Sequence, residues 1–210
     1  MSYGLQVYSA AGYVQIDETY ANYSLIQAGT TTTNLPVVVT GGLSRTMVFV
    51  RIPYGQTIAS KISGVTDAFK AAPIGVGAAD FTYEYRVYRR VPNTPTPGMG
   101  LQVFDAGGAL TFDSNKSYAR ILSAALIDVT GLSSSAYVAG FGSQPWIWFD
   151  PLYTAAFTQS GNPNYGYQHA LCARLHVDNS VEYGVGLLGQ GPPVVDDVYI
   201  TGTRALLLAK

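Results

Sequence analysis

A fourteen-residue segment occurs twice in this chain of 210 residues, at positions 4–17 and again at positions 100–113. The first copy reads Gly-Leu-Gln-Val-Tyr-Ser-Ala-Ala-Gly-Tyr-Val-Gln-Ile-Asp. The second reads Gly-Leu-Gln-Val-Phe-Asp-Ala-Gly-Gly-Ala-Leu-Thr-Phe-Asp, so seven of the fourteen positions are identical. The repeat constrains the fold strongly, because whatever the segment forms must be formed twice.

Each copy has the pattern of a β-hairpin. Apolar and polar residues alternate in two short runs, which is the period of a β-strand. Between the runs lie residues 9–12 and 105–108, which begin with Ser or Asp and end with Gly. Ser or Asp can accept hydrogen bonds from backbone N–H groups further on, and Gly can adopt positive φ, as a type I turn closed by a bulge requires. The shared residues favour common ancestry of the two hairpins.

Other short runs of strand-like sequence follow each copy at spacings of about ten residues. This spacing predicts an all-β sandwich or barrel with little helix. One short helix is predicted over residues 65–71, ended by Pro73. The predicted strands are 4–8, 13–17, 22–27, 35–40, 46–52, 81–90, 101–104, 109–113, 120–129, 136–141, 145–149, 170–178, 181–188, 195–201 and 203–209.

A proline-rich stretch, Pro-Asn-Thr-Pro-Thr-Pro-Gly at residues 92–98, immediately precedes the second copy. Its prolines exclude a central strand and favour a stiff, extended chain. We therefore expect two β-sandwich-like modules, residues 1–91 and 99–210, joined by this linker and each opened by a homologous hairpin. Whether the two halves form separate sandwiches or interleave in one is left open.

The composition is poor in charge and rich in tyrosine. Charged residues make up 12% of the chain, against about 25% in typical domains, and there are 16 tyrosines. Interfaces are depleted in Lys and Glu and enriched in Tyr. The composition therefore fits a chain whose surface is partly covered in an assembly, and it fits equally a soluble β-protein that is merely rich in Tyr. The net charge of −1 does not favour nucleic acid as a partner. The apolar runs are too short for membrane insertion, and no signal peptide is expected.

One basic cluster, Arg86, Arg89 and Arg90, alternates with tyrosines. Basic and aromatic residues interleave in this way on some nucleic-acid platforms. Charge on a strand can also protect a sheet edge against unwanted pairing. We favour the edge strand.

No catalytic motif stands out, so we expect no enzyme, no cofactor and no metal. Residues 184–189 match the Gly-x-Gly-x-x-Gly fingerprint, but Gly191-Pro192-Pro193 follows, where the fingerprint needs a helix. His169, Cys172 and His176 are metal-ligand types, but their alternation predicts a strand that points His169 and Cys172 to opposite faces. A nucleophilic thiol–imidazole pair of Cys172 and His176 would form only if the fold happened to bring the two side chains together. Because Cys172 is the single cysteine, no intrachain disulfide can form.

Two tryptophans, Trp146 and Trp148, share one face of a predicted strand. Buried, they are core; exposed, they could grip a partner protein or stack on sugar rings. We favour core packing, with a subunit interface next. Residues 150–168 are rich in Gly, Pro, Asn and Tyr and are predicted to be a surface loop of the kind that carries contacts. The candidate contact residues for a partner or glycan are Trp146, Trp148, Tyr153, Tyr165 and Tyr167.

The opening phrase of residues 4–17 resembles the N-terminal phrase of small structural proteins encoded in the tail gene modules of long-tailed bacteriophages. The segment Tyr85-Arg86-Val87-Tyr88 also resembles segments of that group. The resemblance covers these stretches only, and this chain differs by carrying the opening twice. It implies a virion protein of the tail tip, baseplate or fibre attachment, assembled in the host cytoplasm, and it implies no activity. Other tail proteins and copies of itself would then be its partners. A carbohydrate or receptor binder at the host-facing end of the tail is the alternative.

Overall fold

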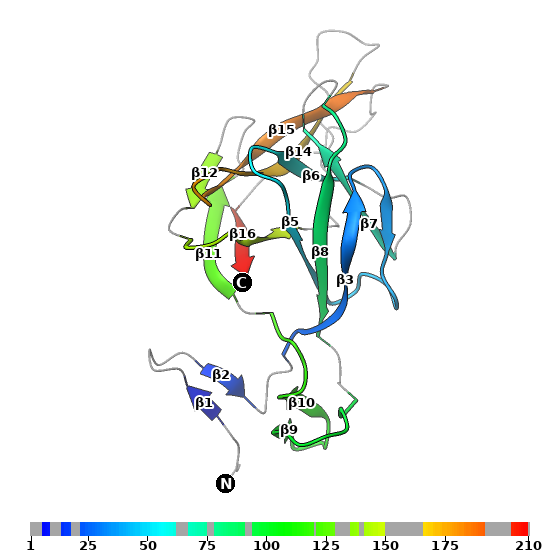
Figure 1. The fold of residues 1–210 in the computed structure, drawn as a ribbon, viewed down its shortest axis with the longest axis vertical. Coiled ribbons are helices and arrows are strands. Elements are labelled where there is room, and N and C mark those ends of the chain that lie inside the picture. The colour runs from blue at the N-terminus through cyan, green and yellow to red at the C-terminus, as the bar shows by residue number, and fades with distance from the viewer. Residues whose placement is uncertain are drawn as a thin grey trace.

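The structure is a computed structural model that describes residues 6–8, 14–17, 22–61, 67–74, 78–90, 94–119, 121–128, 135–138, 141–149, 166–191 and 203–209. Every regular element in this part of the chain is a β-strand, which confirms the predicted all-β class (Figure 1). The strands before the linker are β1 (Gln6–Tyr8), β2 (Val14–Asp17), β3 (Ser24–Thr32), β4 (Pro36–Val38), β5 (Thr46–Arg51), β6 (Thr57–Lys61), β7 (Ala68–Pro73) and β8 (Thr82–Arg89). Those after it are β9 (Gln102–Phe104), β10 (Leu110–Asp113), β11 (Ile121–Asp128), β12 (Ser135–Val138), β13 (Trp146–Phe149), β14 (Gly166–Leu175), β15 (Val181–Gly191) and β16 (Thr203–Ala209).

Twelve of these strands form two six-stranded antiparallel sheets that pack in a sandwich-like manner. The first, here called the β5 sheet, has the order β11-β16-β13-β5-β8-β3. The second, the β6 sheet, has the order β12-β15-β14-β6-β7-β4. The remaining strands form the hairpins β1–β2 and β9–β10, which lie at the same end of the molecule, below the sheets in Figure 1.

Both sheets contain strands from both sides of the proline-rich linker. β5 pairs with β13, where Val50 lies opposite Ile147, and β6 pairs with β14, where Ala59 lies opposite Cys172. The two halves therefore interleave, which decides the question that the sequence left open. The physical reason is that each half supplies only three strands to a sheet, and the open edges of β5 and β6 place their backbone groups in hydrogen bonds with the other half.

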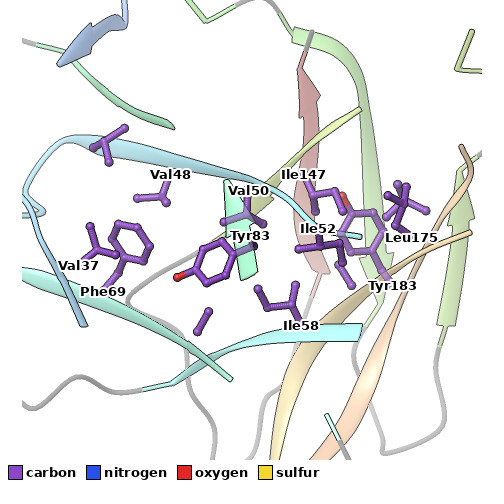
Figure 2. Close-up of a cluster of buried hydrophobic side chains, with 14 of the residues drawn as sticks. Val37, Val48, Val50, Ile52, Ile58, Phe69, Tyr83, Ile147, Leu175 and Tyr183 are labelled. Carbon is purple, nitrogen blue, oxygen red and sulfur yellow. The ribbon is translucent and has the colours of Figure 1, made fainter. Parts of the chain in front are cut away.

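The main core fills the space between the two sheets (Figure 2). Val48 and Val50 of β5 face Ile58 of β6 and Phe69 of β7 across this space, and all four side chains are buried. Burying one such side chain contributes about 1.5–3 kcal/mol, so this layer is what holds the sheets together. Its buried members are Val37, Val39, Leu43, Val48, Val50, Ile52, Ile58, Phe69, Ala71, Tyr83, Val87, Ile147, Ala173, Leu175, Val181 and Tyr183.

Residues 68–71 belong to strand β7, so the predicted helix over 65–71 is wrong for this part; residues 62–66 lie outside the described residues. Strand β6 was not predicted. The Ala, Lys and Phe residues of β7 are compatible with a helix and with a strand, and the pairing of β7 with β4 and β6 selects the strand. The extended backbone buries Phe69 and Ala71 together in the core. The predicted strand 195–201 also lies outside the described residues.

The sequence repeat is also a repeat of structure. Each hairpin pairs its Gln with its final Asp, Gln6 with Asp17 and Gln102 with Asp113. In both, the register shifts at the equivalent residue, Gln15 in β1–β2 and Thr111 in β9–β10. Two hairpins with the same register and the same bulge position are what a duplicated segment should form.

The second hairpin has the predicted turn. The Asp105 carboxylate oxygen Oδ1 accepts hydrogen bonds from the backbone N–H of Gly107 at 2.9 Å and of Ala109 at 2.8 Å. Gly108 has φ of 80°, a conformation that favours glycine. The predicted turn at residues 9–12 of the first hairpin lies outside the described residues.

The last residue of the second copy, Asp113, joins the linker to the hairpin. Its side chain is 0% exposed and accepts hydrogen bonds from the backbone N–H of Thr96 at 2.8 Å and of Asn115 at 2.9 Å, and from the Gln102 amide at 3.3 Å. The N–H groups of Thr96 and Asn115 favour the ionised form and lower the pKa of Asp113. Thr96 of the proline-rich segment is thereby fixed against the hairpin.

Replacing this carboxylate should weaken the fold in a pH-dependent manner. The folded pKa lies below the unfolded value of about 3.9. The carboxylate therefore stabilises the fold above that pH, and this stabilisation is lost as the pH falls through the folded pKa. In Asp113→Asn we expect a lower urea midpoint at pH 7 and a smaller decrease between pH 7 and pH 3 than in the parent. Asp67→Asn, at an exposed aspartate just before β7, is the control. Parent-like midpoints for Asp113→Asn at both pH values would contradict the assignment.

Two buried tyrosines provide a second test. The hydroxyl oxygens of Tyr83 and Tyr183 are enclosed in the core and have no hydrogen-bond partner among the described residues, and burial raises the pKa of both phenols. An unsatisfied buried hydroxyl is unfavourable, so Tyr83→Phe and Tyr183→Phe should leave the free energy of unfolding unchanged or raise it. Tyr83→Ala should lower it by about 3–5 kcal/mol, because it leaves a cavity. Chemical denaturation of the three variants measures this, and a loss above about 1 kcal/mol in either Phe variant would show that its hydroxyl has a partner.

Candidate interaction surfaces

The outer face of the β5 sheet, away from the main core, carries an aromatic cluster. Side chains alternate along β5, so Phe49 points away from the face that Val48 and Val50 bury. Phe49 packs with Tyr88 of β8 and Trp146 of β13, and all three side chains are buried. The cluster, here called the outer cluster, also includes the partly buried Tyr23, Leu25, Met47, Ala119 and Trp148.

Two arginines complete this cluster. The guanidinium carbons of Arg51 and Arg86 lie over the Trp146 ring, at 4.4 Å and 4.2 Å from its centroid. Such contacts stabilise by about 0.5–2 kcal/mol, more when desolvated. Arg51 also pairs with Glu84, with a nitrogen–oxygen distance of 3.6 Å. Phe49 and Tyr88 meet edge to face, with ring centroids 5.7 Å apart.

The predicted contact residues fall in different environments. Trp146 is 3% exposed, and Trp148 is partly buried beside it. Tyr167 belongs to β14, and its side chain lies outside the described residues, as do Tyr153 and Tyr165. Of the predicted loop 150–168, residues 150–165 lie outside the described residues, and residues 166–168 belong to β14 rather than to a loop.

The predicted edge position of the basic cluster is wrong. Arg86 and Arg89 lie on β8, which pairs with β3 on one side and with β5 on the other. Arg86 stacks on Trp146, and Arg89 donates a hydrogen bond to the carbonyl of Gly42. These two arginines therefore make contacts within the molecule, where an aromatic face or a carbonyl oxygen stabilises the positive charge.

Sequence reasoning missed Arg51 and Glu84 of this cluster. Arg51 follows the apolar run of β5, and its distance of two residues from Phe49 places it on the same face. That alternation was the available signal. Trp146, whose ring stacks with the Arg51 guanidinium, lies on the other side of the linker. No local sequence pattern connects Trp146 with Arg51.

A second candidate surface lies around the β9–β10 hairpin. Met99, Leu101 and Phe104 are exposed there, with Met99 98% exposed. The hairpin is tied to the residues just before β3, because the N–H of Asn22 donates to the carbonyl of Thr111 at 3.4 Å. Three exposed apolar side chains in one short segment are the kind of patch that marks a contact with another protein.

The residues considered for chemistry do not form a reactive site among the described residues. Residues 184–189 lie within strand β15, as expected from the prolines that follow them. Cys172 lies on β14, and the His176 ring nitrogen Nε2 lies 3.1 Å from a Glu182 carboxylate oxygen. No group of three metal-ligand side chains is gathered within the described ranges, where the side chain of His169 is not included.

No protein-family model, no curated protein and no solved structure matches this chain. In the part of the chain that the structure describes, no helix is long and apolar enough to span a membrane.

The thiol of Cys172 should react slowly. Burial, and secondarily the charge of Glu182, raises the pKa of the Cys172 thiol to about 11. At pH 8 such a thiol has ~10² less thiolate than an unperturbed cysteine, and the thiolate is the nucleophile. Alkylation by iodoacetamide should therefore be ~10²-fold slower in the folded protein than in urea. A folded-state rate equal to that in urea would instead indicate an activated thiol.

Proposed function

We propose that this chain is a non-enzymatic structural protein of a bacteriophage tail, located in the virion and acting through protein–protein contacts. The observation that carries the proposal is the duplicated opening hairpin, whose sequence resembles the opening of small tail proteins. The two copies share register and bulge position, so the phrase is a structural unit rather than a coincidence of sequence. The charge-poor, Tyr-rich composition fits a surface that neighbouring subunits cover.

Strand β3 offers a route to such contacts. It is an edge strand of nine residues, Ser-Leu-Ile-Gln-Ala-Gly-Thr-Thr-Thr, without charge or proline. Natural edge strands usually carry Lys, Pro or a bulge that prevents pairing with another chain. Here the bulge lies near Leu25, and the segment after it, from Gln27 to Thr32, has regular register. Addition of a strand from a second copy or another tail protein would extend the β5 sheet.

The proposal predicts that purified particles of the phage that encodes this chain contain it in the tail. Peptides of the chain should appear in the mass spectrum of the particles, and antibody labelling should mark the tail in electron micrographs. Particles with neither signal would overturn the proposal.

The same experiment can test β3. Thr30→Lys, at an exposed position of β3, should reduce incorporation into the tail and self-association in native mass spectrometry, because it places charge at the pairing edge. Thr94→Lys, at an exposed position of the linker, is the matched control and should incorporate normally. Equal incorporation of both variants would remove β3 from the interface.

A second candidate function is recognition of a glycan or receptor at the host-facing end of the tail. The observation that favours it is the partly buried Trp148, which packs against the outer cluster in which two arginines stack on Trp146. Aromatic rings with one apolar face and a polar neighbourhood are frequent contact residues for ligands.

A further inference from the structure

The arginines and the indole of the outer cluster form a compact group on three adjacent strands. Arg51 comes from β5, Arg86 from β8 and Trp146 from β13, and both guanidinium groups lie within 4.4 Å of the centroid of one indole ring. Neighbouring strands are about 4.8 Å apart, so the two cations are held close to each other by the sheet itself. We call this group the Arg51–Trp146–Arg86 site.

The site carries an excess of positive charge. Arg51 is paired with Glu84, whereas Arg86 has no carboxylate partner within the described residues. One carboxylate thus faces two guanidinium groups, which leaves a formal charge of +1. The Arg51 side chain is 32% exposed and that of Glu84 51% exposed, so an anion can reach this group from solvent. Guanidinium groups bind carboxylates with paired hydrogen bonds.

The site also has unused hydrogen-bond donors. The Nε of Arg51 and the Nε1 of Trp146 are enclosed and have no acceptor among the described residues. Buried N–H groups in proteins nearly always have an acceptor, so two unsatisfied donors in one contact group are unusual. Both groups are N–H donors, so what each of them needs is an acceptor atom. A ligand that brings oxygen atoms, with a small shift of the Arg51 side chain, would satisfy them.

Trp148 extends the site. It lies on the same face of β13 as Trp146, two residues further along, and packs against the same cluster. Trp148 and Arg86 both lie opposite Phe49 in register, on the strands to either side of β5, so Phe49 separates them on this face. Trp148 also packs against the main core. A partly buried indole beside a cationic group suits a ligand with a flat apolar face and a carboxylate. A sugar ring of a uronic acid has both.

We propose that the Arg51–Trp146–Arg86 site binds the carboxylate of an acidic sugar, with Trp148 against the sugar ring. This deepens the second candidate function, since it names the chemical class of the glycan, and it does not depend on the role in tail assembly. Glu84 occupies Arg51 in the absence of ligand and competes with the ligand carboxylate. The neutral face of the sugar ring is what favours a saccharide over an acidic peptide at Trp148.

The test uses the full chain and calorimetric titration with three probes: an oligogalacturonate, a neutral maltooligosaccharide of similar length, and a glutamate oligopeptide. We expect the oligogalacturonate to bind, with an affinity that falls as salt is raised. Arg86→Gln should weaken binding about tenfold or more, and Trp148→Ala should also weaken it. Glu84→Gln should strengthen binding, because it removes the competing carboxylate. Arg174→Gln, at an exposed arginine of the β6 sheet, is the matched control and should bind as the parent does.

The outcomes separate the proposals. Equal binding of the acidic and the neutral saccharide would overturn the carboxylate site and leave glycan recognition standing. Binding of the glutamate peptide alone would overturn it in favour of an acidic protein partner. Binding of none of the three probes by a correctly folded parent would overturn it outright, while the labelling of phage tails would still decide the structural role. An affinity unchanged in both Glu84→Gln and Arg86→Gln would place the saccharide elsewhere. The urea midpoint of each variant checks that it is folded.

Discussion

Both faces of β5 are buried, and most of the molecule is arranged around that condition. Val48 and Val50 enter the core between the sheets, while Phe49 enters the outer cluster. A strand buried on both faces needs a partner on both edges, because an unpaired backbone group away from water is unfavourable by about 1–3 kcal/mol. β8 supplies one edge from the same half of the chain, and β13 supplies the other from beyond the linker.

The linker is consequently part of the structure rather than a hinge between independent domains. Strands from both halves share each sheet, and Asp113 fixes Thr96 of the linker to the second hairpin. An ionised, fully buried carboxylate is tolerated there because it is satisfied by backbone N–H groups and an amide. The duplicated hairpins end up at the same end of the molecule (Figure 1). Phe104 is an exposed residue of the second copy, and the exposed Met99 directly precedes that copy.

The outer cluster links the fold to the proposed recognition of acidic ligands. Arginines on an interior strand would ordinarily be unfavourable, since their charge must be stabilised by neighbours. Here the guanidinium groups of Arg51 and Arg86 both stack on the Trp146 ring, whereas the Glu84 carboxylate neutralises the charge of Arg51 alone. The interactions that stabilise the cluster therefore leave a residual charge and two enclosed donors without an acceptor among the described residues. Stability and the proposed recognition draw on the same side chains.

Local pattern was enough for the strand class, the hairpins and the turn at Asp105, because alternation and the preference of Asp and Gly for turn positions act over a few residues. It was not enough for residues 68–71, where the sequence tolerates a helix and only pairing with β4 and β6 imposes a strand. Nor could it place Arg86 in the interior of a sheet or bring Trp146 to Arg51. These contacts join residues on different strands, and they exist only because the two halves of the chain share their sheets, which tertiary hydrogen bonding decides and sequence periodicity does not encode.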